Sequence, residues 1–308
     1  MTSATGSSSR LGTLVSRAIV TVTAAGGFAG LCWADATGLF AAAPAWWLVP
    51  AATLLAYGAA AEAARMAADR GYGCDGRLVP VAAAAVPLAA VAAAQAPSAA
   101  GNGPAAIIGW AAVAAWAAIA AACVAEIARY RPGGKSLARL AVVALAALAI
   151  GLPLAFMVGL RLVPAAAAGN GLAALVPLVS MVAVVKGGDI AAYVVGSLVG
   201  SRKLAPVVSP GKTWEGAAAS LAASLAVAWL ILERSGWSEG GQPWGGWAVY
   251  GLAVGVAGML GDLSESLVKR ELAAKDSGHS LGGLGGFLDL IDATLMAAPV
   301  AWLLWVLG

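Results

Sequence analysis

Long apolar stretches, each about long enough to cross a lipid bilayer, dominate this chain. Of its 308 residues, 61% are apolar, whereas roughly 45–50% is typical of soluble domains. A spanning helix needs about 20 mostly apolar residues. Hydropathy predicts nine such segments, near residues 18–37, 43–64, 79–95, 104–125, 140–160, 171–186, 216–233, 246–261 and 288–306. The sequence therefore predicts an all-α, polytopic membrane protein with about nine transmembrane helices.

The positions of Lys and Arg support this topology independently. Cytoplasmic loops of membrane proteins carry an excess of positive residues. If the N-terminus is cytoplasmic, sixteen of the 18 Lys and Arg fall in inner segments, and only Arg161 and Arg234 fall in outer loops. The inner residues are spread over several loops, which suits contact with anionic lipid headgroups. We therefore expect membrane lipid, and no nucleic acid, as a partner.

The chain is predicted to form one membrane domain over residues 1–308. Residues 1–10 are rich in Ser, Thr and Gly, a composition typical of disorder. Residues 1–139 supply the N-terminal helices, and 140–308 carry the motifs and form the predicted catalytic core. In the first part, Glu62 stands three residues before Arg65, a spacing that predicts an ordinary ion pair on a helix surface.

Charge is concentrated near the end of the chain, although only 11% of all residues are charged. A helix over 261–270 would place Asp262, Ser266 and Lys269 on one face. Asp289 and Asp292 are three apart at the start of the last apolar segment and share a face. Ionisable groups at membrane depth are costly and usually mark function. We predict that Asp262 and Asp289 converge on one divalent cation such as Mg²⁺, which takes oxygen ligands.

A second polar cluster lies in the preceding inner loop. Asp189 follows an apolar segment, and Lys203 and Lys212 lie within reach of a lipid headgroup or a nucleotide phosphate. Residues 209–211, Ser-Pro-Gly, predict a turn, and Thr213 is a candidate cap for the next helix. The Gly-Lys-Thr run at 211–213 is not a P-loop, because proline occupies position 206, where that motif requires glycine.

Residues 261–292 resemble the signature of the phosphatidate cytidylyltransferases, also called CDP-diacylglycerol synthases. The residues in register are Ser266, Lys269, Arg270, Lys275, Asp276, Gly285, Gly286, Asp289 and Asp292. Asp189 with Tyr193, and the stretch 203–216, are similar to that family's other motif. The chain departs from the pattern at Leu284, where the family has histidine, and at Leu290, where it has arginine. His279 lies five residues before the histidine's place, and a solvated loop residue is the simpler interpretation of it.

The resemblance implies an enzyme that joins CTP to phosphatidate, giving CDP-diacylglycerol and pyrophosphate with Mg²⁺ as cofactor. It implies that Asp262 and Asp289 hold the metal, with Asp292 as a further ligand, and that Lys269 and Arg270 act at the CTP phosphates. The substrate-binding residues that it implies are Asp189, Lys203, Ser209, Lys212, Thr213, Ser266, Lys275, Asp276, Gly285 and Gly286. The expected location is the inner membrane, with the site on the cytoplasmic face. A monovalent cation such as K⁺ beside Mg²⁺, and a homodimer through Gly/Ala-rich helix faces, remain open.

Three alternatives accompany this interpretation. The substitutions at Leu284 and Leu290 leave room for a CTP-dependent enzyme acting on another lipid, such as a polyprenol kinase or an ether-lipid cytidylyltransferase. They also leave room for a catalytically silent homologue. A transporter could use intramembrane acids as an ion path, but its site should lie near the midplane, whereas the charges here cluster toward one face.

Overall fold

The structure is a computed structural model that describes residues 26–37, 39, 47–72, 76–95, 103–132, 134–162, 171–235, 241–274, 278 and 286–308. The prediction of disorder over residues 1–10 lies outside these ranges. So do five of the positions singled out above, namely Lys275, Asp276, His279, Leu284 and Gly285.

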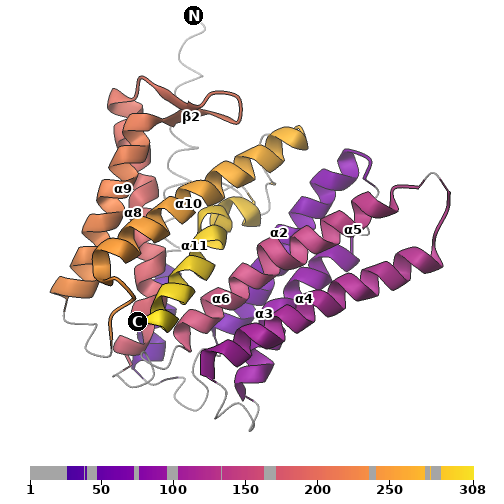
Figure 1. Cartoon of the computed structure of the whole chain (residues 1–308), viewed down its shortest axis with the longest axis horizontal. Coiled ribbons are helices and arrows are strands. Elements are labelled where there is room, and N and C mark those ends of the chain that lie inside the picture. Colours follow the sequence, from indigo (N-terminus) through magenta and orange to yellow (C-terminus); the bar gives the residue numbers. More distant parts are fainter. Residues whose placement is uncertain are drawn as a thin grey trace, which may run out of the picture.

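The molecule is a bundle of helices with one small hairpin at its edge (Figure 1). The first part contains α2 (Leu48–Asp69), α3 (Leu78–Gln95), α4 (Gly103–Ala128) and α5 (Ser136–Leu145), which continues through the π-helical segment Ala146–Gly151 into α6 (Leu152–Arg161). The second part contains α8 (Val176–Val199), α9 (Trp214–Trp229), α10 (Gly246–Glu271) and α11 (Phe287–Leu307). Strands β1 (Lys203–Ala205) and β2 (Ser209–Thr213) connect α8 to α9.

Six helices within the described residues are long and apolar enough to cross a membrane. They cover Ala105–Ala128, Ser136–Arg161, Ala173–Val199, Trp214–Arg234, Gly246–Glu271 and Phe287–Leu307. The chain is thus a polytopic membrane protein with about six candidate spans, where hydropathy predicted nine. Helix α2 carries Glu62, Arg65 and Asp69, which dilute its apolar character. Helix α3 is counted only over Leu78–Ala92, and the first predicted span, 18–37, begins outside the described residues.

Two helices extend further than their apolar stretches. The prediction ended one span at residue 186, yet α8 continues to Val199, so Lys186 and Asp189 lie within the helix and not after it. Helix α10 similarly extends past 261 to Glu271. Hydropathy falls where polar residues begin, but backbone hydrogen bonding continues through them. Both helices thereby carry charged side chains into the bundle.

Within the described residues the chain is helical as predicted, apart from the short β1–β2 hairpin, and this hairpin corrects the predicted turn at 209–211. The strands pair antiparallel, with Lys203 opposite Thr213 and Ala205 opposite Ser209. The turn therefore falls at 206–208, where Pro206 supplies the fixed φ that suits a turn. The predicted cap at Thr213 is confirmed, because its Oγ1 accepts a hydrogen bond from the Gly216 N–H at 3.2 Å.

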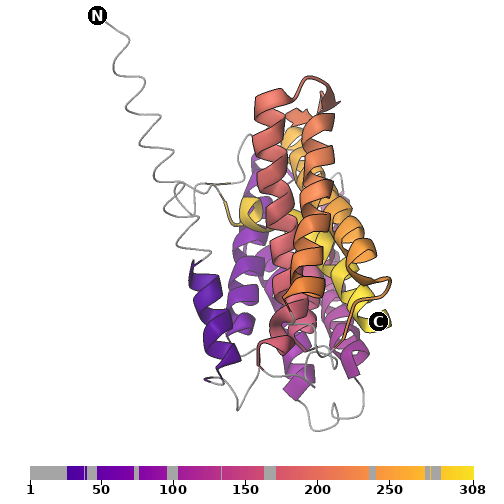
Figure 2. The ribbon, with the colours of Figure 1, turned by 90° about the vertical axis from the view of Figure 1, so that its left-hand side faces the viewer.

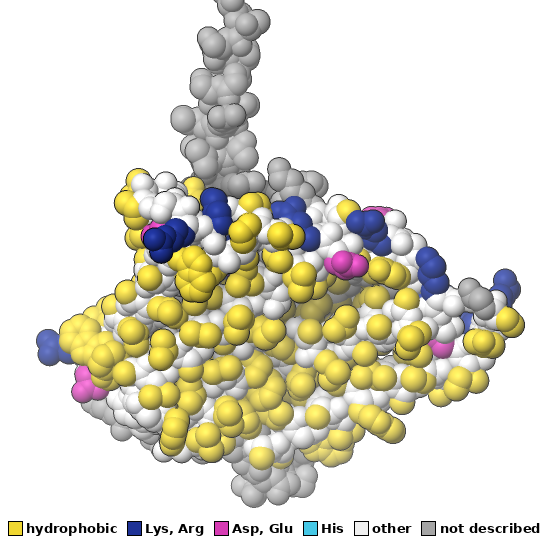
Figure 3. Space-filling view, turned by 45° about the horizontal axis from the view of Figure 1, so that its top comes forward, with side chains coloured by type: hydrophobic (Ala, Val, Ile, Leu, Met, Phe, Trp, Pro, Cys, Tyr) yellow, Lys and Arg dark blue, Asp and Glu magenta, His cyan; other side chains and the backbone are white. Residues whose placement is uncertain are grey.

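The polar ends of the helices gather on one side of the bundle. There Lys135 Nζ donates to the Gly71 carbonyl at 2.7 Å, and Arg270 Nε donates to the Val208 carbonyl at 3.2 Å. In Figure 3, most Lys and Arg side chains of the visible face lie along its upper part, above a broad apolar surface. Helices α8 and α9 stand side by side below the hairpin (Figure 2).

The far end of the 26-residue helix Ser136–Arg161 holds a buried ion pair. Arg161 Nε lies 2.8 Å from Asp35 Oδ2, and the indole N–H of Trp47 donates to the same oxygen at 3.0 Å. Arg161 is 7% exposed. The prediction placed Arg161 in an outer loop, but it ends α6 and joins that helix to the segment over 26–37.

Helices α10 and α11 cross at Gly261, and this contact sets the geometry of the site. A Cβ added at Gly261 would lie 2.5 Å from the Asp292 carbonyl oxygen and 3.0 Å from the Ala293 Cα. Small residues allow helix backbones to approach in this way. As a result, the residues that follow Gly261 on α10 lie directly beside Asp292 on α11.

Replacing Gly261 by Val should separate the two helices and reduce both stability and any metal binding at the crossing. Overpacking of this kind costs about 1–3 kcal/mol. Thermal unfolding in detergent measures the first effect. Gly109→Val in α4 is the matched control, because no atom lies within 4 Å of a Cβ added there. Equal melting temperatures for the two variants would contradict the tight crossing.

Candidate active site

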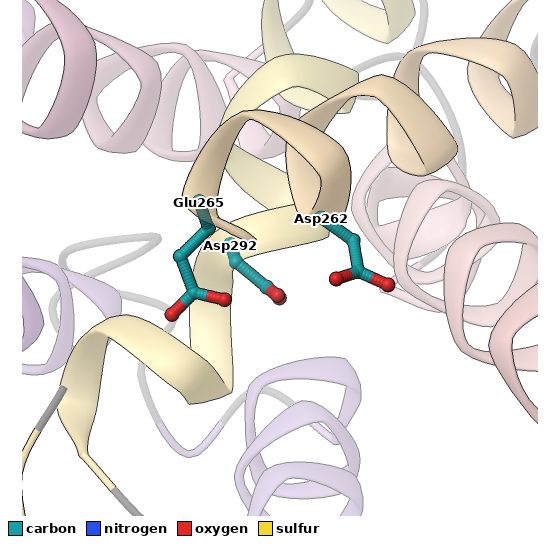
Figure 4. A group of neighbouring side chains, drawn as sticks. All are labelled: Asp262, Glu265 and Asp292. Carbon is teal, nitrogen blue, oxygen red and sulfur yellow. The ribbon is translucent and has the colours of Figure 1, made fainter. Parts of the chain in front are cut away.

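Three carboxylates meet where α10 crosses α11. Asp262 and Glu265 are one turn apart on α10, and Asp292 projects between them from α11 (Figure 4). One carboxylate oxygen of each lies within 4.8 Å of the others. Glu265 is 8% exposed. Three acidic side chains this close repel one another unless cations lie among them. We call Asp262, Glu265 and Asp292 the acidic triad.

Two lysines face the acidic triad from different elements. Lys212 on β2 places its Nζ 2.8 Å from Asp262 Oδ2, so the hairpin reaches the site directly. Lys269, one turn after Glu265 on α10, places its Nζ 2.9 Å from Glu265 Oε1 and 2.5 Å from Asp289 Oδ1. The Lys269 side chain is only 15% exposed. Its ammonium thus joins the first turn of α11 to the last turns of α10.

Asp289 is held differently from the acidic triad. Besides the contact with Lys269, its Oδ2 accepts a hydrogen bond from the Gly286 N–H at 2.9 Å, which caps the start of α11. A carboxylate in the first turn is also favoured by the helix dipole. The structure therefore gathers Asp262 with Glu265 and Asp292, and places Asp289 beside Lys269 at the helix N-terminus.

Helix α8 contributes a third lysine to this region. Lys186 is near the middle of the candidate span Ala173–Val199. Its Nζ lies 3.5 Å from Asp189 Oδ2 and donates to the Leu290 carbonyl at 3.4 Å. A charged residue this far into a span costs about 2.5–3.5 kcal/mol on insertion scales and faces the bundle interior. Lys186 thus brings positive charge from α8 to the region of the carboxylates.

A cavity of about 410 Å³ opens beside the acidic triad, bounded by α8, α9, α10 and the hairpin. Its polar lining comprises Asp189, Tyr193, Ser197, Ser209, Lys212, Thr213, Ser220 and Asp262. Its apolar lining includes Leu204, Met259 and Leu263. A lining that contains both polar and apolar side chains suits a ligand with an anionic head and an apolar body. Asp189 and Tyr193 share a helix face here, as their spacing predicts.

Hydrogen bonds hold the hairpin against the helices. Glu215, in the first turn of α9, accepts from the Ser201 hydroxyl at 2.7 Å and from the Arg202 N–H at 3.2 Å. Arg270 contacts the turn of the hairpin through the Val208 carbonyl. The strand that carries Lys212 is therefore fixed at both ends relative to α9 and α10.

The structure brings some of the predicted site residues together and leaves others at a distance. Asp189, Ser209, Lys212, Thr213 and Asp262 share the cavity. Lys203 lies exposed on β1. On α10, Arg270 is exposed and Ser266 is half-buried. Gly286 caps α11.

Two side chains of the site were missed by sequence reasoning. Glu265 stands three residues after Asp262 at membrane depth, a spacing that could have identified it. The predicted topology counts Lys186 with the inner residues, because the predicted span 171–186 ends there, whereas helix α8 continues to Val199.

The acidic triad fits a hard divalent cation. Mg²⁺ takes carboxylate oxygens and retains positions for substrate phosphates, and the three carboxylate oxygens here lie close enough to share one ion. Asp262 and Asp292 are half-buried and Glu265 is buried, so the cluster sits in a region of weak solvent screening. The described residues thus include a possible metal site, and Asp289 lies beside it in an ion pair with Lys269.

Comparison with known proteins agrees with the geometry. Residues 16–307 match the cytidylyltransferase family. A phosphatidate cytidylyltransferase of Brucella suis is 45% identical over 130 residues, which cover 41% of this chain and 45% of that protein. The corresponding protein of Haemophilus influenzae is 41% identical over 112 residues, 36% of this chain and 39% of its own length. One from Mycobacterium bovis is 39% identical over 127 residues, 41% and 40% of the two chains. The matched region spans less than half the length of these relatives.

Proposed function

This chain belongs to the cytidylyltransferase family, and on that premise we propose that it transfers CMP from CTP to phosphatidate, giving CDP-diacylglycerol and pyrophosphate for phospholipid synthesis. The observation that carries the proposal is the acidic triad with Lys212 and Lys269 beside a cavity that is lined by both polar and apolar side chains. A phosphorylated lipid and a nucleoside triphosphate are the ligands for which this combination of groups is suited.

Electrostatics is the main difficulty of this reaction. An oxygen of the lipid phosphate forms a bond to the α-phosphorus of CTP, and the bond from that phosphorus to the pyrophosphate oxygen breaks. Both reactants are anionic, so catalysis consists chiefly of positioning and charge stabilisation. Lys212 reaches the cavity from the hairpin and would contact phosphate there, while Lys269 keeps Glu265 and Asp289 in place. No covalent intermediate on the protein is required.

Mg²⁺ is the cofactor that we propose, held by Asp262, Glu265 and Asp292. When bound, it would neutralise phosphate charge and favour departure of pyrophosphate. Asp289, which the resemblance implied as a ligand, would instead orient Lys269 and the first turn of α11. Whether K⁺ assists can be tested by exchanging monovalent salts in the same assay.

The proposed orientation places the hairpin and the acidic triad on the cytoplasmic side of the cell membrane, with the N-terminus inside. Most Lys and Arg side chains of the face in Figure 3 lie along its upper part, and a cytoplasmic position of that part would agree with the positive-inside rule. CTP would enter from the cytoplasm, and phosphatidate from the surrounding leaflet. A homodimer is compatible with the many exposed small residues of the helices.

The test is turnover by the purified chain in lipid nanodiscs with CTP and Mg²⁺. Phosphatidate, diacylglycerol and a polyprenol are compared as acceptors, and the lipid product is identified by mass. We expect CDP-diacylglycerol from phosphatidate alone, and none after chelation of Mg²⁺. A phosphorylated product from diacylglycerol or polyprenol would identify a CTP-dependent kinase and overturn the proposal.

A further inference from the structure

A fully buried carboxylate from the N-terminal part of the chain reaches the start of α11. Glu62 on α2 is 0% exposed, and its Oε2 accepts a hydrogen bond from the Leu288 N–H at 3.1 Å. The two residues are 226 positions apart in sequence. Glu62 therefore joins the N-terminal helices to the helix that carries Asp289 and Asp292.

The backbone of α11 explains why a remote side chain is needed. Gly286 is the N-cap residue and Leu288 is the second residue of the helix. An N-cap side chain ordinarily accepts from the N–H of the second or third helical residue, but glycine has no side chain to do so. Glu62 supplies the missing acceptor, and the helix dipole stabilises its negative charge.

A second contact fixes the same turn. A Cβ added at Gly58 would lie 2.5 Å from the ring of Phe287, the first residue of α11. Gly58 and Glu62 are four residues apart, so they lie on one face of α2. The Phe287 ring packs against Gly58, and Glu62 accepts the hydrogen bond from the Leu288 N–H. We call these two contacts the α2 clamp.

We propose that Glu62 is a positioning residue of the active site, which acts through the α2 clamp on the first turns of α11. Asp289 follows Leu288 directly and contacts Lys269, and Asp292 lies one turn further in the acidic triad. A small shift of α11 along its axis would separate Asp292 from Asp262 and Glu265. The N-terminal helices thereby help to set the metal site, although they lie outside the motifs. The part of this proposal that concerns metal rests on the proposed function.

Two readouts test the α2 clamp separately. Hydrogen exchange of the amides over residues 286–293 reports on the first turns of α11 and needs neither metal nor CTP. Affinity for Mn²⁺, measured by electron paramagnetic resonance in nanodiscs, reports on the acidic triad. The variants are Glu62→Met, which fills similar space without an acceptor, and Glu62→Gln, which keeps a carbonyl acceptor. Glu126→Gln is the control, because it disturbs an ion pair with Arg139 that is remote from α11.

For Glu62→Met we expect exchange over 286–293 to rise about tenfold, the scale of losing one helix cap. We expect Mn²⁺ affinity to fall about tenfold or more, as when partners of metal ligands are removed. Glu62→Gln should keep exchange over 286–293 and Mn²⁺ affinity close to their wild-type values. Glu126→Gln should leave both quantities unchanged. If Glu62→Met does not fold, Phe287→Leu loosens the same turn and should raise exchange there to a smaller extent.

Unchanged exchange over 286–293 in Glu62→Met would overturn the α2 clamp, whatever the enzyme assay shows. Exchange that rises equally in all helices would also overturn it, because it would indicate general destabilisation. Local exchange that rises while Mn²⁺ affinity stays at the wild-type value would contradict the link to the metal site. Absence of CTP turnover in the wild type would count against the proposed function and would leave the exchange result intact.

Discussion

Replacing Asp262 by Asn should reduce CTP-dependent lipid product by about 10²-fold or more, the scale observed when one preorganised electrostatic group is removed from an active site. Asp262 belongs to the acidic triad and is also the ion-pair partner of Lys212. Asn preserves the shape of the side chain but removes its charge. The variant therefore weakens cation binding and releases the hairpin lysine at the same time.

The measurement for Asp262→Asn is steady-state turnover across a Mg²⁺ titration in nanodiscs. We expect both a lower maximal rate and a higher Mg²⁺ requirement. Glu271→Gln is the matched control, because Glu271 is an exposed acid at the end of the same helix. Retention of more than a third of wild-type turnover by Asp262→Asn would contradict its assignment as a metal ligand.

The second large effect is expected for Lys269→Met. The Lys269 ammonium lies between Glu265 and Asp289, whose side chains are only 6% and 18% exposed. Removing one partner of a buried ion pair leaves an uncompensated charge and costs about 3–5 kcal/mol. For a chain of this size, that loss corresponds to a fall in melting temperature of about 10 °C. Turnover should also be lost, because α10 and the first turn of α11 are no longer joined.

A double variant separates the two consequences of losing Lys269. Lys269→Met with Asp289→Asn removes one of the two unpaired charges, so part of the melting temperature should return while turnover stays absent. Lys203→Met is the control for stability, because Lys203 is exposed on β1 and its removal should change the melting temperature little. Equal melting temperatures for Lys269→Met and Lys203→Met would show that the Lys269 contacts do not stabilise the fold.

Much of the architecture could be predicted from the sequence, because hydropathy and positive charge report directly on a bilayer. Within the described residues, the predicted apolar stretches fall on helices, and most Lys and Arg of the face in Figure 3 lie along its upper part. Helix ends were harder to place. In α8, hydropathy falls at Lys186, yet the helix continues to Val199. The hairpin was missed because its strands are short and one contains Pro210, which is tolerated in a two-stranded edge.

The residues of the site could be predicted better than the contacts between their side chains. Asp262 and Asp292 are conspicuous because acids are rare in apolar segments. Asp289 and Asp292 look alike in the sequence, and only tertiary contacts distinguish them. Asp289 forms an ion pair with Lys269 and accepts a hydrogen bond from the Gly286 N–H. Glu62 illustrates the same limit, because its partner Leu288 lies 226 residues away. Helical periodicity along one segment carries no information about such a contact.

The most direct test of the central claim follows two labels of CTP with phosphatidate as acceptor. Wild-type protein in nanodiscs is supplied with CTP that carries ³²P at either the α- or the γ-phosphate, and the lipid and water phases are counted. We predict that the α label enters the lipid and the γ label leaves as pyrophosphate, and that Asp262→Asn reduces both by about 10²-fold or more. Label from the γ-phosphate in the lipid would contradict cytidylyl transfer. So would the absence of lipid label in a folded sample under conditions in which a known phosphatidate cytidylyltransferase is active.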